Sequence, residues 1–355
     1  MRDYIIVGAG LAGIAFAEIA LDEGKSVVVV SDASQNSSNI AAGLYNPVIL
    51  KRFSQVWQAE EQLDLLTKFY RKLEDKLGLK LDYKLPLLRK FFSVEEQNNW
   101  FAASDKPELA KFLSTSLITT KYDSVISPFH FGEVLQSGYV DTNLLLASYK
   151  RYLIALASLY DETFDYSNLV IESDFVSYKN LKAKRIVFAE GFGIRLNPFF
   201  NNLPLDGTKG ELVLIKATNL NINTIMKSSI FVIPLGNDLY KVGATYNWQD
   251  KSNMPTEQAK KELTDNLKEL ITCDYEIIEH YAGVRPTVKD RRPMLGSHPI
   301  YKNLFVLNGL GTRGVMLAPA MAKMLFNHIE NDEDLNPYVD IKRFKAFASN
   351  PYHNE

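Results

Sequence analysis

Residues 1–32 constrain the fold more than any other stretch of this chain. A short apolar run, Tyr4–Val7, precedes the glycine-rich turn Gly8-Ala9-Gly10-Leu11-Ala12-Gly13. An alanine-rich helical pattern then continues to Glu23, and a β-branched run occupies Val27–Val30. This order predicts a strand, a tight turn, a helix and a second strand, which is the unit that binds the pyrophosphate of a dinucleotide.

The spacing of the glycines explains why such a turn binds phosphate. One glycine permits the tight turn, one lets the backbone approach the pyrophosphate, and one lets the helix pack closely on the strand. The helix N-terminus adds free N–H groups and a partial positive charge. We therefore expect the cofactor to contact the following residues of the turn: Gly8, Gly10, Leu11, Ala12 and Gly13.

The partner of the adenosine ribose is less clear from the sequence. An acidic residue normally closes the second strand of this unit and binds the ribose hydroxyls. Here that place falls on Ser31, and Asp32 follows directly. Both residues stay open as the ribose partner.

Charge and composition exclude several functional classes. The net charge of −2 makes nucleic acid an unlikely main partner. Cys273 is the only cysteine, which excludes an internal disulfide and a cysteine-built metal site. The five histidines show no ligand spacing, so we expect no metal. Because we find neither a long apolar run nor a signal peptide, we expect no transmembrane segment and a cytoplasmic location.

Apolar spacing and turn residues outline the rest of the chain. Helices are expected over residues 57–77, 142–157, 256–271 and 315–329, with Pro319 tolerable only in the first turn of the last one. Short extended pieces include Phe175-Val176, and Val176 is a candidate cofactor contact. Residues 211–246 read as a mostly antiparallel sheet. Two further glycine-rich junctions, at Glu190-Gly191 and at 308–314, each follow an apolar strand pattern.

Taken together, these motifs resemble the D-amino-acid-oxidase-like flavoproteins. The resemblance extends nearly end to end and rests on five motifs: 7–13, Ser37-Ser38-Asn39-Ile40-Ala41-Ala42-Gly43, Gly138-Tyr139-Val140-Asp141, 282–290 and Gly309-Leu310-Gly311-Thr312-Arg313-Gly314. It implies an α/β fold in which an FAD-binding Rossmann-like domain carries an inserted substrate domain, built on a mostly antiparallel sheet plus helices. The expected FAD-binding domain is 1–45, 138–204 and 283–355, and the substrate domain is 46–137 and 205–282.

The resemblance also implies how FAD is bound. We expect FAD without nicotinamide, and without a covalent link, since no cysteine lies where some members attach the flavin. Besides the first turn and the ribose candidates, the implied cofactor contacts are Ala41, Ala42, Gly43, Gly191, Gly311, Thr312, Arg313, Gly314 and Val315. A helix N-terminus at the last of these segments would stabilise negative charge at the flavin N1–C2=O edge.

Two basic residues are candidates for the catalytic site. Arg285 matches the arginine that holds the substrate carboxylate in related oxidases, and a guanidinium suits that role as a planar, permanently charged fork. The alternative is an arginine that braces the junction between domains. Lys241 aligns with a lysine that promotes reaction with oxygen in some members, although most strand lysines face solvent. Tyr246 and Tyr281 are weaker candidates for the cavity wall.

The implied function is oxidation of the C–N bond of a small amine or amino acid by hydride transfer to flavin N5. Oxygen or a quinone would accept the electrons. Two alternatives remain: a stand-alone oxidase that removes the carboxymethyl group from a modified wobble uridine of tRNA, and a non-catalytic flavin-binding module. Ser31, in the usual acidic position, is the only hint of the last.

Overall fold

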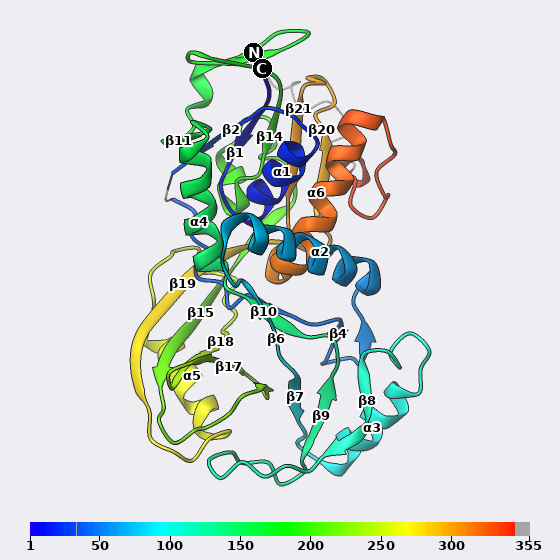
Figure 1. The fold of residues 1–355 in the computed structure, drawn as a ribbon, viewed down its shortest axis with the longest axis vertical. Helices are drawn as coiled ribbons and strands as arrows, with labels where there is room; N and C mark the ends of the chain where they lie inside the picture. The colour runs from blue at the N-terminus through cyan, green and yellow to red at the C-terminus, as the bar shows by residue number, and fades with distance from the viewer. Residues whose placement is uncertain (33, 345–355) are drawn as a thin grey trace.

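The computed structural model describes residues 1–32 and 34–344, and Figure 1 shows two sheets stacked along its long axis. The last stretch of the predicted FAD-binding domain, 345–355, lies outside the described residues. In the upper part, helices α1, α4 and α6 cover one face of the first sheet. The second sheet forms the lower part, and α2 crosses between the two. The division into two domains at the boundaries given above stays a prediction.

The first sheet is built around a parallel core. Its strand order is β11 (Leu159–Asp161), β2 (Val27–Ser31), β1 (Arg2–Val7), β14 (Leu181–Phe188), β13 (Val176–Tyr178) and β12 (Leu169–Ile171), with β21 (Leu304–Asn308) also on β14 and β20 (Met294–Ser297) on β21. β1 pairs in parallel with β2 and β14. Tyr4 and Ile6 face one hydrophobic cluster while Ile5 and Val7 face another, so β1 is buried on both sides, as parallel strands are.

The helices over this sheet are α1 (Leu11–Asp22), α4 (Thr142–Ala155) and α6 (Gly314–Asn331), and α2 (Ala59–Leu77) packs against α6. The N-cap of α4 is Asp141, whose side chain accepts a hydrogen bond from the Leu144 N–H. Gly78 ends α2 in the left-handed conformation, as the sequence indicates.

The expectation that α6 holds Pro319 only in its first turn is wrong. The helix begins at Gly314, so Pro319 lies inside it. A proline there leaves the carbonyl four residues earlier, that of Val315, without its helical donor. The buried Tyr70 hydroxyl of α2 donates a 2.9 Å hydrogen bond to this carbonyl. A tertiary contact therefore replaces the bond that proline removes.

The second sheet is mostly antiparallel, as expected. Its order is β19 (Glu276–Val288), β15 (Leu205–Lys216), β18 (Leu239–Gly243), β17 (Phe231–Gly236), β16 (Ile225–Lys227), β7 (Leu87–Lys90), β9 (Phe131–Val134) and β8 (Leu113–Ile118). Only the pairing of β16 with β7 is parallel within this order. Helix α5 (Glu257–Lys268) covers one face of β15, and α3 (Val94–Ser104) packs on β8. The other face of β15 is turned toward the first sheet, where the cavity lies.

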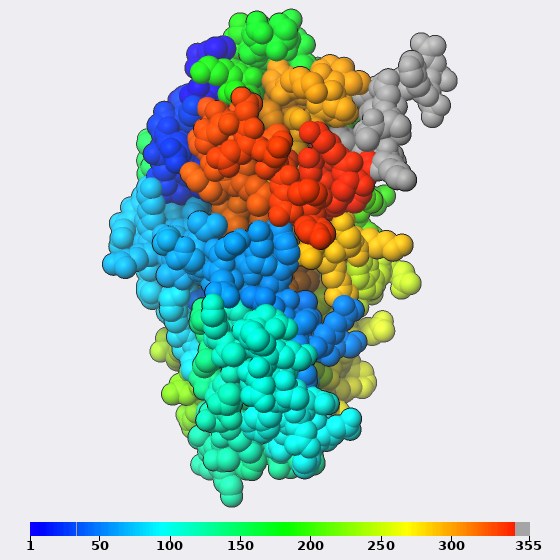
Figure 2. Space-filling model, turned by 90° about the vertical axis from the view of Figure 1, so that its right-hand side faces the viewer, coloured from blue at the N-terminus to red at the C-terminus, as the bar shows by residue number. Residues whose placement is uncertain are grey.

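Smaller elements join the two sheets. β3 (Leu44–Tyr45) and β6 (Asp82–Lys84) flank β10 (Gly138–Val140), and β4 (Val48–Ile49) pairs with β5 (Ser54–Gln55). Short 3-10 turns are η1 (Tyr166–Asn168), η2 (Gly191–Leu196), η3 (Gly311–Arg313) and η4 (Ile341–Arg343). Figure 2 shows the same order on another face, with α6 above α2 and the segment of α3 and β8 at the foot.

Candidate functional site

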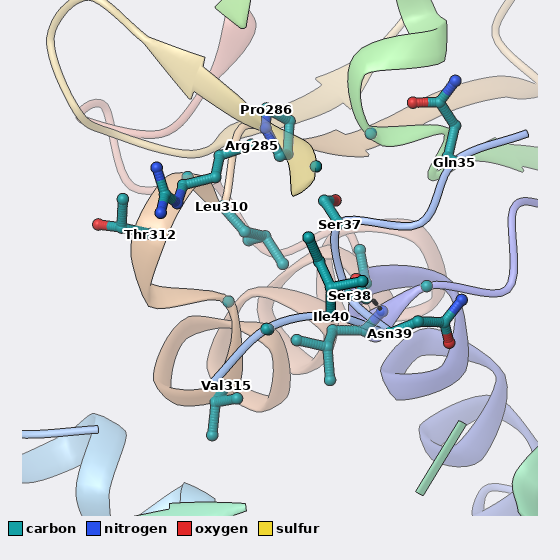
Figure 3. Close-up of a pocket in the computed structure, with 18 of the residues that line it drawn as sticks. Gln35, Ser37, Ser38, Asn39, Ile40, Arg285, Pro286, Leu310, Thr312 and Val315 are labelled. Atoms are coloured by element: carbon teal, nitrogen blue, oxygen red, sulfur yellow. Dashed lines mark hydrogen bonds between the residues drawn. The ribbon is translucent and has the colours of Figure 1, made fainter. Parts of the chain in front are cut away.

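A cavity of about 710 Å³ extends from the glycine turn of β1 to the inner face of the second sheet. Both sheets contribute to its wall, and so do the loop after β2 and the turn before α6. Figure 3 shows these segments converging: the loop of Ser37–Ile40 faces the strand end that carries Arg285 and Pro286, with Leu310, Thr312 and Val315 beside them. The site is therefore assembled from segments far apart in the sequence.

The first glycine turn forms the end of the cavity at the N-terminus of α1. The residues of this turn that line the cavity include Gly8, Gly10, Leu11 and Ala12. The cap residue Gly10 has no side chain, and the Leu11 N–H donates a 3.3 Å hydrogen bond to Ser38 Oγ. Gly8 has a φ of +104°, which only glycine adopts readily. Gly13 does not line the cavity; a Cβ there would lie 1.8 Å from the Gly8 carbonyl oxygen, so its role is close packing of helix on turn.

Both ribose candidates lie on the cavity wall after β2. The Ser31 hydroxyl accepts a 3.2 Å hydrogen bond from the Ala9 N–H, and so supports the glycine turn. The Asp32 carboxylate accepts hydrogen bonds from Ser34 and Thr163. Burial raises the pKa of Asp32, but these hydrogen bonds outweigh it and lower the pKa below its usual value, so the carboxylate stays ionised. Which of the two residues holds the ribose stays open.

The loop after β2 forms a second wall. Ala41, Ala42 and Gly43 line the cavity, and the Thr142 hydroxyl of α4 fixes the Ala41 carbonyl at 3.1 Å. Gly43 has a φ of +74°, and a Cβ there would lie 1.8 Å from the Val140 carbonyl oxygen. Close contact between backbones thus requires glycine at residue 43, and the short side chains of Ala41 and Ala42 leave room for a flat ligand at this wall.

The end of β14 supplies the third wall, where Glu190 and Gly191 line the cavity. Glu190 accepts hydrogen bonds from the Tyr166 hydroxyl and from the Asn197 amide, the latter at 2.8 Å. Burial raises the pKa of this carboxyl to about 7, although both hydrogen bonds act in the opposite direction. The sequence indicated Gly191 but gave no reason to expect a carboxyl that is neutral over part of the physiological range.

The turn Gly311–Gly314, with Val315, also lines the cavity, and Gly314 lies against the Leu11 side chain of the first glycine turn. It forms η3, and α6 begins directly after it. Arg313 is directed inward: its Nη1 is buried and has no hydrogen-bond partner in the described part of the chain. Burial lowers its pKa. An unpaired buried guanidinium nitrogen requires an anionic or carbonyl partner, which a bound ligand would supply.

Arg285 lies on β19 with its side chain extended along the cavity wall, as Figure 3 shows. Its Nη1 donates a 3.2 Å hydrogen bond to the Thr245 carbonyl, and its guanidinium stacks 4.6 Å from the centre of the Tyr246 ring. The guanidinium occupies the space above Gly210, where a Cβ would lie 1.8 Å from Nη2. The structure gives Arg285 no acidic partner among the described residues. Its charge is therefore available to a ligand.

Two other candidates, Val176 and Lys241, are not among the residues that line the cavity. Val176 is fully buried in β13, among the apolar residues that cover one face of the first sheet. Lys241 lies on β18, opposite Leu214 and Ile233, on the face of the sheet that also carries Leu212 and so faces the cavity. Burial lowers its pKa, while the nearby Asp141 raises it. The cofactor contact of Val176 and the catalytic role of Lys241 stay predictions.

Several residues that line the cavity were not predicted from the sequence. Gly210, Leu212, Lys227, Phe231 and Ala244 line the cavity from the second sheet, as does Tyr246; Tyr281 does not line it. These residues come together only through the register of the sheet: Leu212 faces Gly243, and Phe231 lies opposite both Gly243 and Lys227. The pattern of a single strand carries no such signal. No group of three or more potential metal ligands occurs in residues 1–32 and 34–344.

The match to known families decides which cofactor this cavity suits. Residues 3–327 match the family described as DAO, FAD dependent oxidoreductase. The chain belongs to this family. The match covers most of the chain and includes the first glycine turn, Arg285 and the turn before α6, so the cofactor of the cavity is FAD and the protein is an FAD-dependent oxidoreductase.

Individual relatives are distant. The chain is 23% identical, over 97% of its length, to the tRNA 5-methylaminomethyl-2-thiouridine biosynthesis bifunctional protein of Idiomarina loihiensis, and spans 59% of that protein. It is 21% identical to glycine oxidase of Bacillus subtilis over 93% of this chain and 94% of the relative. The crystal structure of glycine oxidase from Geobacillus kaustophilus superposes with a TM-score of 0.78, at 20% identity, over 95% of this chain and 98% of that one. The last comparison shows a shared fold.

The residues of the cavity fit FAD. The N-terminus of α1, where the cap residue Gly10 has no side chain, and the glycine conformation of Gly8 suit a pyrophosphate, and the small residues 41–43 suit a flat ring. Within the described part of the chain the buried Arg313 Nη1 has no hydrogen-bond partner, and an isoalloxazine carbonyl or a substrate would provide one. Cys273 does not line the cavity. Among the described residues, no helix is both long and apolar enough to cross a membrane.

Proposed function

We propose that this protein oxidises the C–N bond of a small amine or amino acid. The observation that carries the proposal is the Arg285 guanidinium, which has no acidic partner in residues 1–32 and 34–344 and lies over Gly210 in the cavity that suits FAD. A guanidinium on the wall of a partly apolar cavity is a strong receptor for a carboxylate, because two parallel charge-assisted hydrogen bonds fix its orientation. This favours an amino acid, whose carboxylate would be held there.

Different residues of this chain would have different roles in such a reaction. Arg285 would hold the substrate carboxylate and so orient the Cα–H bond, which gives most of the benefit of proximity. Arg313 and the N-terminus of α6 would stabilise negative charge that develops beside them. Leu212 and Phe231 would exclude water from one side of the substrate. Bound FAD would accept the substrate hydride at N5, without a covalent link to the protein.

Proton transfer needs no dedicated residue in this scheme. The substrate ammonium would lose its proton to water before the hydride leaves, and the imine product would be hydrolysed after release. Oxygen or a quinone would accept the two electrons. Lys241, on the cavity side of β18, is the residue we expect to assist oxygen, and peroxide yield in a Lys241→Met variant would test that role.

Anaerobic mixing tests the proposal. The FAD-loaded protein should lose its flavin absorbance with at least one member of a panel of glycine, sarcosine, and D- and L-amino acids. Arg285→Met should weaken this reduction strongly and Arg285→Lys partly, while Arg71→Met, which removes an exposed arginine on α2, should leave it unchanged. A protein that binds FAD but is reduced by no amine or amino acid would contradict the proposal.

A second function is favoured by one comparison, the tRNA-modifying relative that matches 97% of this chain. In that case Arg285 would hold the carboxymethyl group of a modified wobble uridine. The net charge of −2 argues against an RNA substrate. Bleaching of the flavin by modified tRNA, with free amino acids inactive, would favour this function over the first.

A further inference from the structure

The charged residues of the cavity wall separate into two groups. The acidic members of the lining, Asp32 and Glu190, lie where β2 and β14 of the first sheet end. The other charged lining residues are all basic: Lys51, Lys150, Lys227, Arg285 and Arg313. Of these, Lys227 and Arg285 belong to strands of the second sheet. One carboxylate on Arg285 would leave several of these positive charges uncompensated.

Lys227 is the basic residue whose surroundings are most unusual. It ends β16, opposite Phe231 of β17, and is only partly exposed. Its Nζ donates a 3.0 Å hydrogen bond to the Ser229 carbonyl, and no carboxylate lies within salt-bridge distance of it in the described residues. A lysine in such a place usually has an anionic partner, because a half-buried charge is costly without one.

The residues beside Lys227 do not supply an anionic partner for its ammonium group. Arg89 of β7 lies beside it, and Arg89 is paired with Glu96 at 2.7 Å and with the Ser228 carbonyl at 2.8 Å. Glu96 is therefore engaged elsewhere. Burial lowers the pKa of Lys227 to about 8, and the charge of Arg89 acts in the same direction. At neutral pH the ammonium is still mainly protonated, so it can attract an anion.

The register of the second sheet gives the separation of the two cationic groups. The Arg285 guanidinium lies over Gly210 of β15, and β18 and β17 lie between β15 and β16. Three strand spacings of about 4.8 Å, with an offset of two residues along the strands between Gly210 and the row of Leu212 and Lys227, place these points on the order of 16 Å apart. The long stem of Lys227 shortens the gap, and a salt bridge at each end takes up about 3 Å. A ligand that bridges them needs two acidic groups several bonds apart.

We propose that Lys227 forms a second anion subsite, and that the preferred substrate is an amino acid whose side chain ends in an acidic group. This inference rests on the proposed function, since it adds a subsite to the same cavity. The α-carboxylate would lie on Arg285 and the side-chain carboxylate near Lys227. A dicarboxylic amino acid of glutamate length fits this arrangement better than glycine does, because glycine leaves Lys227 without a partner.

Glutamate and glutamine provide a matched test, since they differ mainly in the charge of the terminal group. With the FAD-loaded protein under anaerobic conditions, the enantiomer of glutamate that reduces the flavin should do so with an apparent affinity about tenfold or more above that of the same enantiomer of glutamine. Lys227→Met should abolish this preference. Lys216→Met, which removes an exposed lysine from the end of β15, should preserve it.

Equilibrium binding separates this inference from the proposed function. Calorimetry with glutarate and butyrate, which cannot be oxidised at a C–N bond, should show tighter binding of the dicarboxylate to the wild type and equal binding to Lys227→Met. Equal binding to the wild type, or a preference that survives in Lys227→Met, would overturn the inference. If glutarate binds through Lys227 but no amine reduces the flavin, the proposed function fails and the anion subsite stands.

Discussion

Replacement of Gly210 by alanine tests how Arg285 is positioned. A Cβ at residue 210 would lie 1.8 Å from Nη2 and 2.0 Å from Cζ of Arg285, which no real structure tolerates. The atoms in the way belong to the end of a flexible side chain, so the guanidinium should move instead of the backbone. Gly210 does not have a positive φ, so alanine introduces no backbone strain. We therefore expect a change in unfolding free energy of about 1 kcal/mol or less.

The effect on ligand binding should be much larger. A displaced guanidinium loses its bidentate contact with a carboxylate, which is worth about 1.5–3 kcal/mol, or roughly 10- to 100-fold in affinity. Titration of the FAD-loaded protein with a carboxylate inhibitor, followed by the flavin absorbance, measures this loss. Gly193→Ala is a suitable control, because its Cβ would meet Gln35 only at an ordinary 3.5 Å in the same cavity.

A double-mutant cycle shows whether Gly210 acts through Arg285. If it does, adding Gly210→Ala to Arg285→Met should weaken carboxylate binding no further, since the affected group is already gone. Equal affinity of Gly210→Ala and the wild type would refute the placement of the guanidinium. Additive losses in the double mutant would refute the mechanism.

Three further changes test the supports of the site. Tyr70→Phe should cost about 1–3 kcal/mol of stability, seen as a lower Tm, because the Val315 carbonyl beside Pro319 loses its donor; the exposed Tyr338→Phe should not lower it. Glu190 has a pKa raised from 4.5 to about 7, so its contribution to stability is complete below pH 4.5 and is lost as the pH rises through 7. The FAD-free wild type should lose up to about 3 kcal/mol relative to Glu190→Gln over that range in urea unfolding, and parallel pH profiles would contradict this. Lys209→Met should lower the free energy of unfolding by about 3–5 kcal/mol, because the buried Lys209 of β15 binds Asp250 and the Met254 carbonyl. It should also weaken carboxylate binding, because these contacts fix the loop whose Thr245 carbonyl accepts a hydrogen bond from Arg285. Unchanged carboxylate affinity would contradict the second effect.

The parts of the site that could be predicted from sequence are those formed by local motifs. Gly8 and Gly10 belong to a turn whose chemistry is determined within one strand–helix unit, and Gly311–Gly314 precede a helix in the same way. The order of apolar runs and turn residues likewise indicated a parallel sheet at the N-terminus and a mostly antiparallel sheet over 211–246. Family resemblance then singled out Arg285, which lies on the cavity wall.

The parts that could not be predicted depend on tertiary register. Lys227 and Gly210 are unremarkable in their own strands, and only the pairing of β15 with β18, of β18 with β17 and of β17 with β16 brings them to one cavity face. The position of Pro319 inside α6 is possible because a hydroxyl from another helix reaches the Val315 carbonyl. Local sequence rules predict the loss of the helical hydrogen bond, but they do not predict the tertiary hydrogen bond that replaces it.

Packing accounts for the remaining differences between expectation and structure. Gly13 belongs to the glycine fingerprint, but it supports the turn from beneath and does not line the cavity. Val176 lies in the buried core against β14, and Lys241 lies on the cavity face of its strand but outside the lining. The place of a residue in a motif is therefore a poor guide to whether that residue lines the cavity.

A crystal structure of the FAD-loaded protein with a carboxylate inhibitor would test the central claim most directly. We expect the pyrophosphate at the N-terminus of α1 and the inhibitor carboxylate in bidentate contact with Arg285, with its guanidinium still above Gly210. A carboxylate bound elsewhere, with Arg285 turned away from the cavity, would contradict the account.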